Sequence, residues 1–196
     1  MFGRSHKRDV VETVKGFIFN PKKQFDKERK TKLNDAGCYF LSLLFLMSVL
    51  FSIVSSFVLS SFLGSAAAWF WIVALFSTYV SLIIFKIVWG LWLHLWVLLL
   101  TKGKKFDQTL KAVFFGGTPF YLFGWIPVIG FLSMIWSLVL DIIGLSRLHK
   151  IERSHAAIAA VIAVLIPLLV AVFVFAWILA VLFALPFMAG IPNVPL

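Results

Sequence analysis

Charged residues are confined to a few short stretches of this 196-residue chain, and that distribution limits the folds open to it. Apart from Lys86 and Asp141, every Lys, Arg, Asp and Glu lies within residues 1–35, 102–111 or 147–153. The gaps without charge are residues 64–65, 124–127 and the tail 189–196. Because basic residues strongly prefer the cytoplasmic side of a bilayer, this alternation predicts a membrane topology.

The composition agrees with a lipid environment. The chain is 62% hydrophobic and 13% charged, whereas soluble domains average about 45–50% apolar and about 25% charged residues. Its net charge of +10 comes largely from the N-terminus, where ten of the 18 Lys and Arg residues precede residue 36. Juxtamembrane basic clusters are typical of contact with anionic lipid headgroups. We therefore expect the bilayer, and no nucleic acid, as the partner of these charges.

The apolar runs predict an all-α, polytopic integral membrane protein with five transmembrane helices in a domain of residues 36–187. The expected spans are about 36–63, 66–100, 107–123, 128–146 and 155–187. A span needs about 20 residues, but splitting the second run at Lys86 would move the following basic loop outside. Five spans place the N-terminus and all basic loops in the cytoplasm and the tail 188–196 outside.

The basic N-terminal segment, residues 1–35, contains a short amphipathic helix over residues 8–19. Val10, Val11, Val14, Phe17 and Ile18 share one helical face. Two interpretations are open: a helix lying in the membrane interface, or a cytoplasmic helix packed on the inner mouth of the bundle.

Proline and glycine predict a break inside the third span and a tight turn after it. Thr118 and Pro119 follow two glycines, and a proline inside a helix removes a backbone hydrogen bond and kinks it. Pro127 and Gly130 mark the turn that joins the third and fourth spans into a hairpin.

Small residues at helical spacing predict the faces on which the spans pack, since close approach drives helix association in lipid. These stripes are Ser48, Ser52, Ser56 and Ser60; Ser133, Ser137, Asp141 and Gly144; and Ala156, Ala160, Ala176, Ala180 and Ala184.

Lys86, His94 and Asp141 are the candidate functional polar residues, because ionisable groups at membrane depth cost at least about 2.5–3.5 kcal/mol. Their depths along the helices predict a hydrogen bond between His94 and Asp141, and place Lys86 too far outward for a direct pair. Lys86 is expected to stack on Trp89, to reach a carbonyl freed by Pro119, or to snorkel to a surface. The alternative for Asp141 is contact with a basic residue at the end of its helix, Arg147 or Lys150.

The remaining basic residues near the expected spans are candidates for contact with lipid headgroups. They are Lys22, Lys23, Lys102, Lys104, Lys105, Arg147, Lys150 and Arg153. No catalytic motif, metal-ligand spacing or phosphate-binding loop occurs in the sequence, so we expect no enzyme and no cofactor.

One ordered set of motifs resembles the Yip1 domain family. It runs from Lys111 through Thr118-Pro119 and Ile126-Pro127-x-x-Gly130 to a helix with Trp136, Gly144-Leu145 and His149, then Ala156-Ala157; the opening Phe17-Ile-Phe-Asn-Pro21 with Phe25 is also similar. The chain lacks the Asp-Leu-Tyr-Gly-Pro type motif of eukaryotic members, so it resembles the prokaryotic-type branch. The resemblance implies five spans, a cytoplasmic N-terminus and, for a prokaryote, the cell membrane.

Two functions are compatible with these features. The first is a non-enzymatic membrane protein that organises the bilayer or recruits partners, which include anionic headgroups, a second copy and another membrane protein. The alternative is a small transporter or channel for an ion, a proton or a lipid that uses Lys86, His94 and Asp141. The odd number of spans without an inverted repeat counts against transport.

Overall fold

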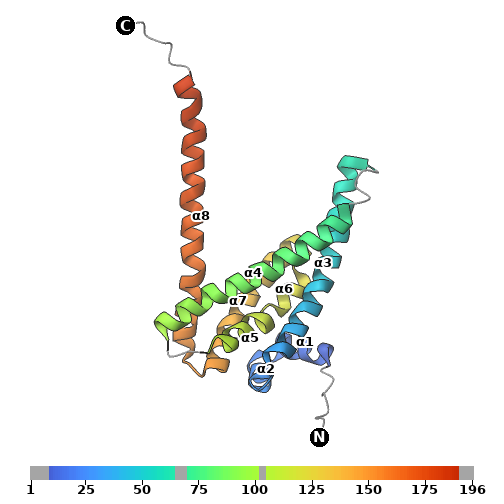
Figure 1. The fold of residues 1–196 in the computed structure, drawn as a ribbon, viewed down its shortest axis with the longest axis vertical. Coiled ribbons are helices and arrows are strands. Elements are labelled where there is room, and N and C mark those ends of the chain that lie inside the picture. The colour runs from blue at the N-terminus through green and yellow to red at the C-terminus, as the bar shows by residue number, and fades with distance from the viewer. Residues whose placement is uncertain (1–8, 65–69, 102–104, 190–196) are drawn as a thin grey trace. The chain divides into compact units, whose positions relative to one another are not determined.

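A computed structural model describes residues 9–64, 70–101 and 105–189, and within them the chain forms eight α-helices (Figure 1). The helices are α1 (Val10–Phe19), α2 (Pro21–Glu28), α3 (Leu33–Leu63), α4 (Phe70–Leu100), α5 (Phe106–Gly116), α6 (Thr118–Phe123), α7 (Pro127–His149) and α8 (Arg153–Ala189). They divide into two compact units, Met1–Ala160 and Val161–Leu196. The second unit consists, in its described part, of the continuation of α8.

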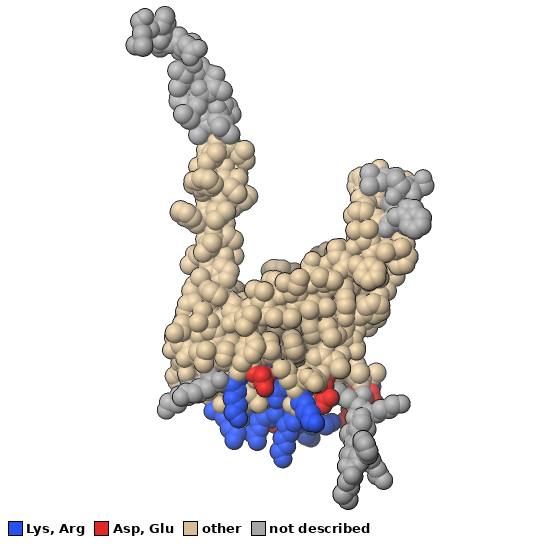
Figure 2. Space-filling model, viewed as in Figure 1, with Lys and Arg blue, Asp and Glu red and all other residues tan. Residues whose placement is uncertain are grey.

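Four helices in the described part of the chain are long and apolar enough to cross a membrane. They are Leu33–Phe62, Phe70–Leu100, Pro127–His149 and Arg153–Leu182. The chain is therefore an integral multi-pass membrane protein. In the first unit the exposed Lys and Arg side chains gather at one end, beside the apolar surface of α3 and α4 (Figure 2).

The expected third span is two short helices, α5 and α6, which are not among these four. Helix α5 ends at Gly116, and α6 restarts with Thr118 and Pro119 in its first turn. Proline is well placed at a helix start because the amide it lacks would have no partner there. The five-span count thus stays a prediction, and the expected kink is a break between two helices.

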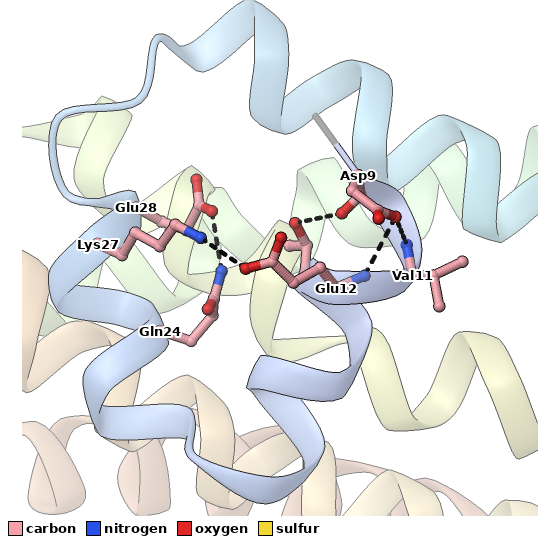
Figure 3. A network of polar contacts seen from close by, with 7 residues as sticks. Asp9, Val11, Glu12, Gln24, Lys27 and Glu28 are labelled. Atoms are coloured by element: carbon pink, nitrogen blue, oxygen red, sulfur yellow. Dashed lines mark hydrogen bonds and ion pairs between the residues drawn. The ribbon is translucent and has the colours of Figure 1, made fainter. Parts of the chain in front are cut away.

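The N-terminal helices α1 and α2 form a hairpin joined by polar contacts (Figure 3). Asp9 caps α1, since its carboxylate accepts hydrogen bonds from the amides of Val11 and Glu12 at 3.0 and 3.3 Å. Lys27 on α2 reaches back to Glu12 on α1 at 3.3 Å. The helix is thus packed against its neighbours, and its position relative to the membrane interface stays a prediction.

Aromatic rings attach this hairpin to the bundle. Phe17 and Phe25 have no exposed surface and pack edge to face with centroids 4.8 Å apart. Phe17 also stacks on Phe115 of α5 at 5.0 Å, and Tyr39 of α3 lies 5.3 Å from Phe115. The three consecutive helices α1, α2 and α3 therefore share one aromatic cluster with α5, although Phe19 at the end of α1 remains 79% exposed.

Helix α5 lies at the centre of the first unit. It packs on α7, α3 and α4, while α2 lies against α7. Every residue from Thr109 to Pro119 is buried. Gly144 of α7 is needed for this packing, since a Cβ there would come within 3.0 Å of both Phe25 and Ala112.

The small-residue stripes are buried where they meet this centre. Ser133, Ser137, Asp141 and Gly144 are all buried, as are Ser48, Ser52, Ala156 and Ala160. Ser56 is half-buried and Ser60 is exposed, so the seam of α3 covers only its first half. Ala176 and Ala180 lie in the second unit, where α8 is exposed, and the side chain of Ala184 is outside the described residues.

Candidate functional site

Lys86 is a buried cation in the middle of α4, with 7% of its surface exposed. Its Nζ lies 5.8 Å from the centroid of the Phe120 ring and 5.4 Å from that of Tyr121. Cations over aromatic faces are attracted by the ring quadrupole, more strongly where water is excluded. The expected stacking on Trp89 is thus replaced by contact with the two aromatic residues that directly follow Pro119.

Asp141 is buried in α7 and meets α4 through Trp89, whose indole Nε1 donates to Oδ2 at 3.3 Å. Its other oxygen, Oδ1, is buried without a hydrogen-bond partner among the described residues. This oxygen faces α5 so closely that a Cβ at Gly116 would overlap it. The predicted hydrogen bond from His94 to Asp141 is wrong.

The alternative contact of Asp141 with the end of its own helix is also wrong. Arg147 pairs with Asp26 of α2 at 3.5 Å, which ties the hairpin to α7. Among the described residues no ion pair within 4.0 Å joins Lys86 and Asp141. The two charges therefore face the α5–α6 break from opposite helices without direct contact.

The break itself is held by hydroxyl groups. Thr118 Oγ1 donates to the carbonyl of Phe115 at 2.6 Å and lies 2.9 Å from the hydroxyl of Tyr39. The amide of Phe120 donates to Ser137 Oγ of α7 at 3.2 Å. These bonds satisfy backbone groups that the interrupted helix leaves open, which is necessary in a water-poor interior.

Tyr121 completes a buried polar centre, which we define as Lys86, Trp89, Tyr121 and Asp141. The Tyr121 hydroxyl is buried and has no hydrogen-bond partner among the described residues. A Cβ at Gly117 would overlap that hydroxyl, so the second glycine makes room for the tyrosine. The sequence did not single out Tyr121, although it follows Pro119 by two residues. It also predicted that Trp89 contacts Lys86, whereas Trp89 bonds to Asp141.

His94 belongs to a separate hydrogen-bonded chain at the ends of α4 and α7. Its Nδ1 lies 2.8 Å from Thr109 Oγ1, and the same hydroxyl lies 2.9 Å from Nε2 of His149. Because a hydroxyl has one proton to donate, at least one imidazole nitrogen must donate to Thr109. The third predicted polar residue thus lies apart from Lys86 and Asp141.

Lys111 has a role that its place in a basic stretch does not predict. It is buried in α5, and its Nζ donates to the carbonyls of Arg29 and Thr31 at 3.0 and 3.1 Å. Lys111 therefore holds the end of the N-terminal hairpin onto the central helix.

The exposed basic residues form a basic face at the charged end of the first unit (Figure 2). Of the candidates for lipid contact, Lys22, Lys23, Lys105, Lys150 and Arg153 are exposed and Arg147 is half-buried. Lys102 and Lys104 lie outside the described residues. A pocket of about 410 Å³ opens in this face between α2 and the turn joining α7 to α8. Within the described ranges, no group of three or more His, Cys, Asp and Glu residues is placed to hold a metal ion.

Comparison with protein families gives a match to the Yip1 domain over residues 15–178. The chain belongs to the Yip1 domain family. The match spans the buried polar centre, the histidine chain and the basic pocket, so all these features lie within its Yip1 domain. Members of this family are generally non-enzymatic membrane proteins. No curated protein and no solved structure was found to match the chain.

Proposed function

We propose that this Yip1 domain protein organises the membrane, without catalysis, by holding anionic lipid headgroups against its basic face. One observation carries the proposal: basic side chains from α2, from the start of α5 and from the turn between α7 and α8 gather at one end of the first unit. Near an anionic surface each such residue contributes about 1 kcal/mol. A second copy or another membrane protein recruited beside these lipids would extend the organised patch.

The proposal includes the orientation expected from the charges, with the N-terminus and basic face in the cytoplasm of a prokaryotic-type cell and the tail outside. It requires the α5–α6 segment to cross the bilayer as a fifth span. Helices of 11 and six residues with Gly117 between them rise about 27 Å, close to the roughly 30 Å hydrocarbon thickness. A broken helix is tolerated at this depth because protein surrounds it.

The orientation is tested by a single cysteine at the turn between α6 and α7. Trp125→Cys in a Cys38→Ser background is treated on intact cells with a thiol reagent that cannot cross the membrane. Labelling from outside is expected, as Trp125 follows the end of α6 and is half-buried. Labelling only after permeabilisation would make α5–α6 a re-entrant segment and reject the five-span orientation.

Lipid binding is tested with the full chain in nanodiscs that contain phosphatidylcholine and phosphatidylglycerol. Anionic lipid retained after extraction into neutral detergent is counted by mass spectrometry. Replacing Lys22, Lys23 and Lys105 by Gln should lower retention, and raising the salt concentration should lower it in the wild type, because exposed charges are screened. All three residues are exposed, so their substitution leaves the buried contacts of the hairpin intact. Unchanged retention in the variant would reject the proposal.

Transport is the second candidate, and the unpartnered Oδ1 of Asp141 and hydroxyl of Tyr121 near Lys86 favour it. Polar groups with unused hydrogen-bonding capacity beside a broken helix are typical of ion and substrate sites in transporters. Proton and ion flux in proteoliposomes would be lost in Lys86→Met and Asp141→Asn if this candidate is right. Absence of flux in the wild type under several gradients would reject it.

A further inference from the structure

The pocket in the basic face has a composition unlike the rest of that face. Three chain segments line it: the end of α2, the end of α7 and the turn that leads into α8. Its lining residues are Asp26, Arg29, Ser146, Arg147, Lys150, Ile151, Glu152 and Arg153. Four cations against two carboxylates leave a formal excess of two positive charges.

Both carboxylates of the pocket already have partners. Asp26 pairs with Arg147 at 3.5 Å, and Glu152 Oε2 lies 3.5 Å from Nδ1 of His155, which makes an ion pair when that imidazole is protonated. Within the described part of the chain, Arg29, Lys150 and Arg153 form no ion pair within 4.0 Å. Three cations are therefore free to meet an anion that the protein itself does not supply.

The turn between α7 and α8 holds these cations together. Lys150 has a φ of 56°, in the left-handed region, and its amide donates to the carbonyl of Ser146 to end α7. The Ser146 hydroxyl donates onward to the carbonyl of Ile151 at 2.8 Å. A turn bonded in this way holds the backbone that carries Lys150 and Arg153 beside Arg147, so a ligand has to order only their side chains.

We propose that this pocket binds one phosphate monoester group, presented either by a lipid headgroup or by a soluble phosphate. This deepens the proposed binding of anionic lipid and rests on it. A phosphate monoester carries about −1.5 to −2 charge near neutral pH, which matches the excess of two positive charges, whereas a phosphodiester headgroup carries a single charge. Guanidinium groups also bind phosphate oxygens in pairs with defined geometry.

The test uses the full chain in neutral detergent with either phosphatidic acid, a monoester, or phosphatidylglycerol, a diester, at equal total charge. Bound lipids per chain are counted by native mass spectrometry. We expect one phosphatidic acid molecule that stays bound at a salt concentration that removes phosphatidylglycerol. Addition of inorganic phosphate distinguishes the two sources: competition at millimolar concentration assigns the site to soluble phosphate, and its absence assigns the site to the lipid.

Two variants that remove the same number of charges separate the pocket from the rest of the face. Lys150→Asn with Arg153→Gln should weaken phosphatidic acid binding about tenfold or more, since each charge-assisted contact to phosphate is strong, and asparagine tolerates the left-handed backbone at position 150. Lys15→Gln with Lys32→Gln should leave the tightly held phosphatidic acid in place, because both residues are exposed and neither lines the pocket.

The outcomes separate the proposed phosphate pocket from the proposed binding of anionic lipid by the basic face as a whole. Equal binding of the two lipids at matched charge, or equal losses in the two double variants, would overturn the pocket while leaving a general basic face. Failure of both lipids to bind at low salt concentration would overturn the proposed function as well. Helix content measured by circular dichroism confirms that each variant is folded before its binding is compared.

Discussion

Helices α4 and α5 show opposite relations between composition and burial. Helix α4 is apolar over 31 residues, yet only Ala74, Lys86, Gly90, Leu93 and Val97 on it are buried. Its large side chains face outward, with Phe76 63%, Ile84 57% and Phe85 55% exposed. Helix α5 carries Thr109 and Lys111, and it is buried from Thr109 to its end.

This difference indicates which force sorts the helices in a bilayer. Lipid tails solvate Phe and Ile as well as the protein interior does, so apolar side chains gain little from facing inward. Polar groups must find protein partners, and small residues allow the close contacts that provide them. On α4 the buried Lys86 and Gly90 therefore lie on one face, while α5 is enclosed on every side.

The largest loss of stability is expected when a buried aromatic side chain is removed from α5. Phe115→Ala on α5 removes a side chain with no exposed surface that stacks on Phe17. We expect a loss of about 3 kcal/mol in the free energy of unfolding, because the cavity cannot be filled by lipid. The measurement is reversible unfolding in mixed micelles.

Its matched control is Phe85→Ala on α4, where the ring is 55% exposed. Lipid can occupy the space left there, so a change within about 0.5 kcal/mol is expected. Equal losses for the two variants would break the contrast between the helices.

A smaller effect is expected from the cation buried in α5. Lys111→Met removes donors to the carbonyls of Arg29 and Thr31 and should cost about 1.5–3 kcal/mol, the range for hydrogen bonds to charged groups. The N-terminal hairpin should then be cleaved faster by a protease after Arg29 or Lys30. Lys105→Met, at an exposed position before α5, should leave the cleavage rate unchanged; equal acceleration would show that charge alone matters.

The smallest effect tests one hydroxyl at the helix break. Tyr39→Phe removes the hydroxyl that lies 2.9 Å from Thr118 Oγ1 and should cost about 1 kcal/mol. Tyr79→Phe on α4 is the control, since that ring contacts Phe45 edge to face and is half-buried. Tyr39→Phe should have the lower unfolding midpoint of the two variants. Equal midpoints would show that the contact between Tyr39 and Thr118 does not stabilise the break.

Much of this architecture could be predicted from local chemistry. Long apolar runs identified the four helices that can span, and Thr118 and Pro119 identified the break, because proline acts on its own backbone. The stripe from Ser133 to Gly144 was predicted to be a packing face, and all its members are buried. These features depend on residues close together in sequence.

The polar partners could not be predicted in the same way. Residue counts along the helices placed His94 and Asp141 at similar depths in the membrane. Contact also depends on how each helix is rotated about its axis, and His94 contacts Thr109 instead. Lys86 meets rings of α6 that become reachable because the helix breaks before them. Lys111 stands at the end of a basic stretch of sequence, and the carbonyls that it contacts, those of Arg29 and Thr31, lie 82 and 80 residues away along the chain.

The contrast between α4 and α5 is tested most directly by labelling the unmodified protein from within the bilayer. An apolar diazirine dissolved in the lipid is photolysed, and labelled residues are identified by mass spectrometry. We predict labels on the outward residues of α4, including Phe76, Ile84 and Phe85, and none from Thr109 to Pro119. Labelling of the α5–α6 segment as heavy as that of α4 would place it against lipid and contradict the account.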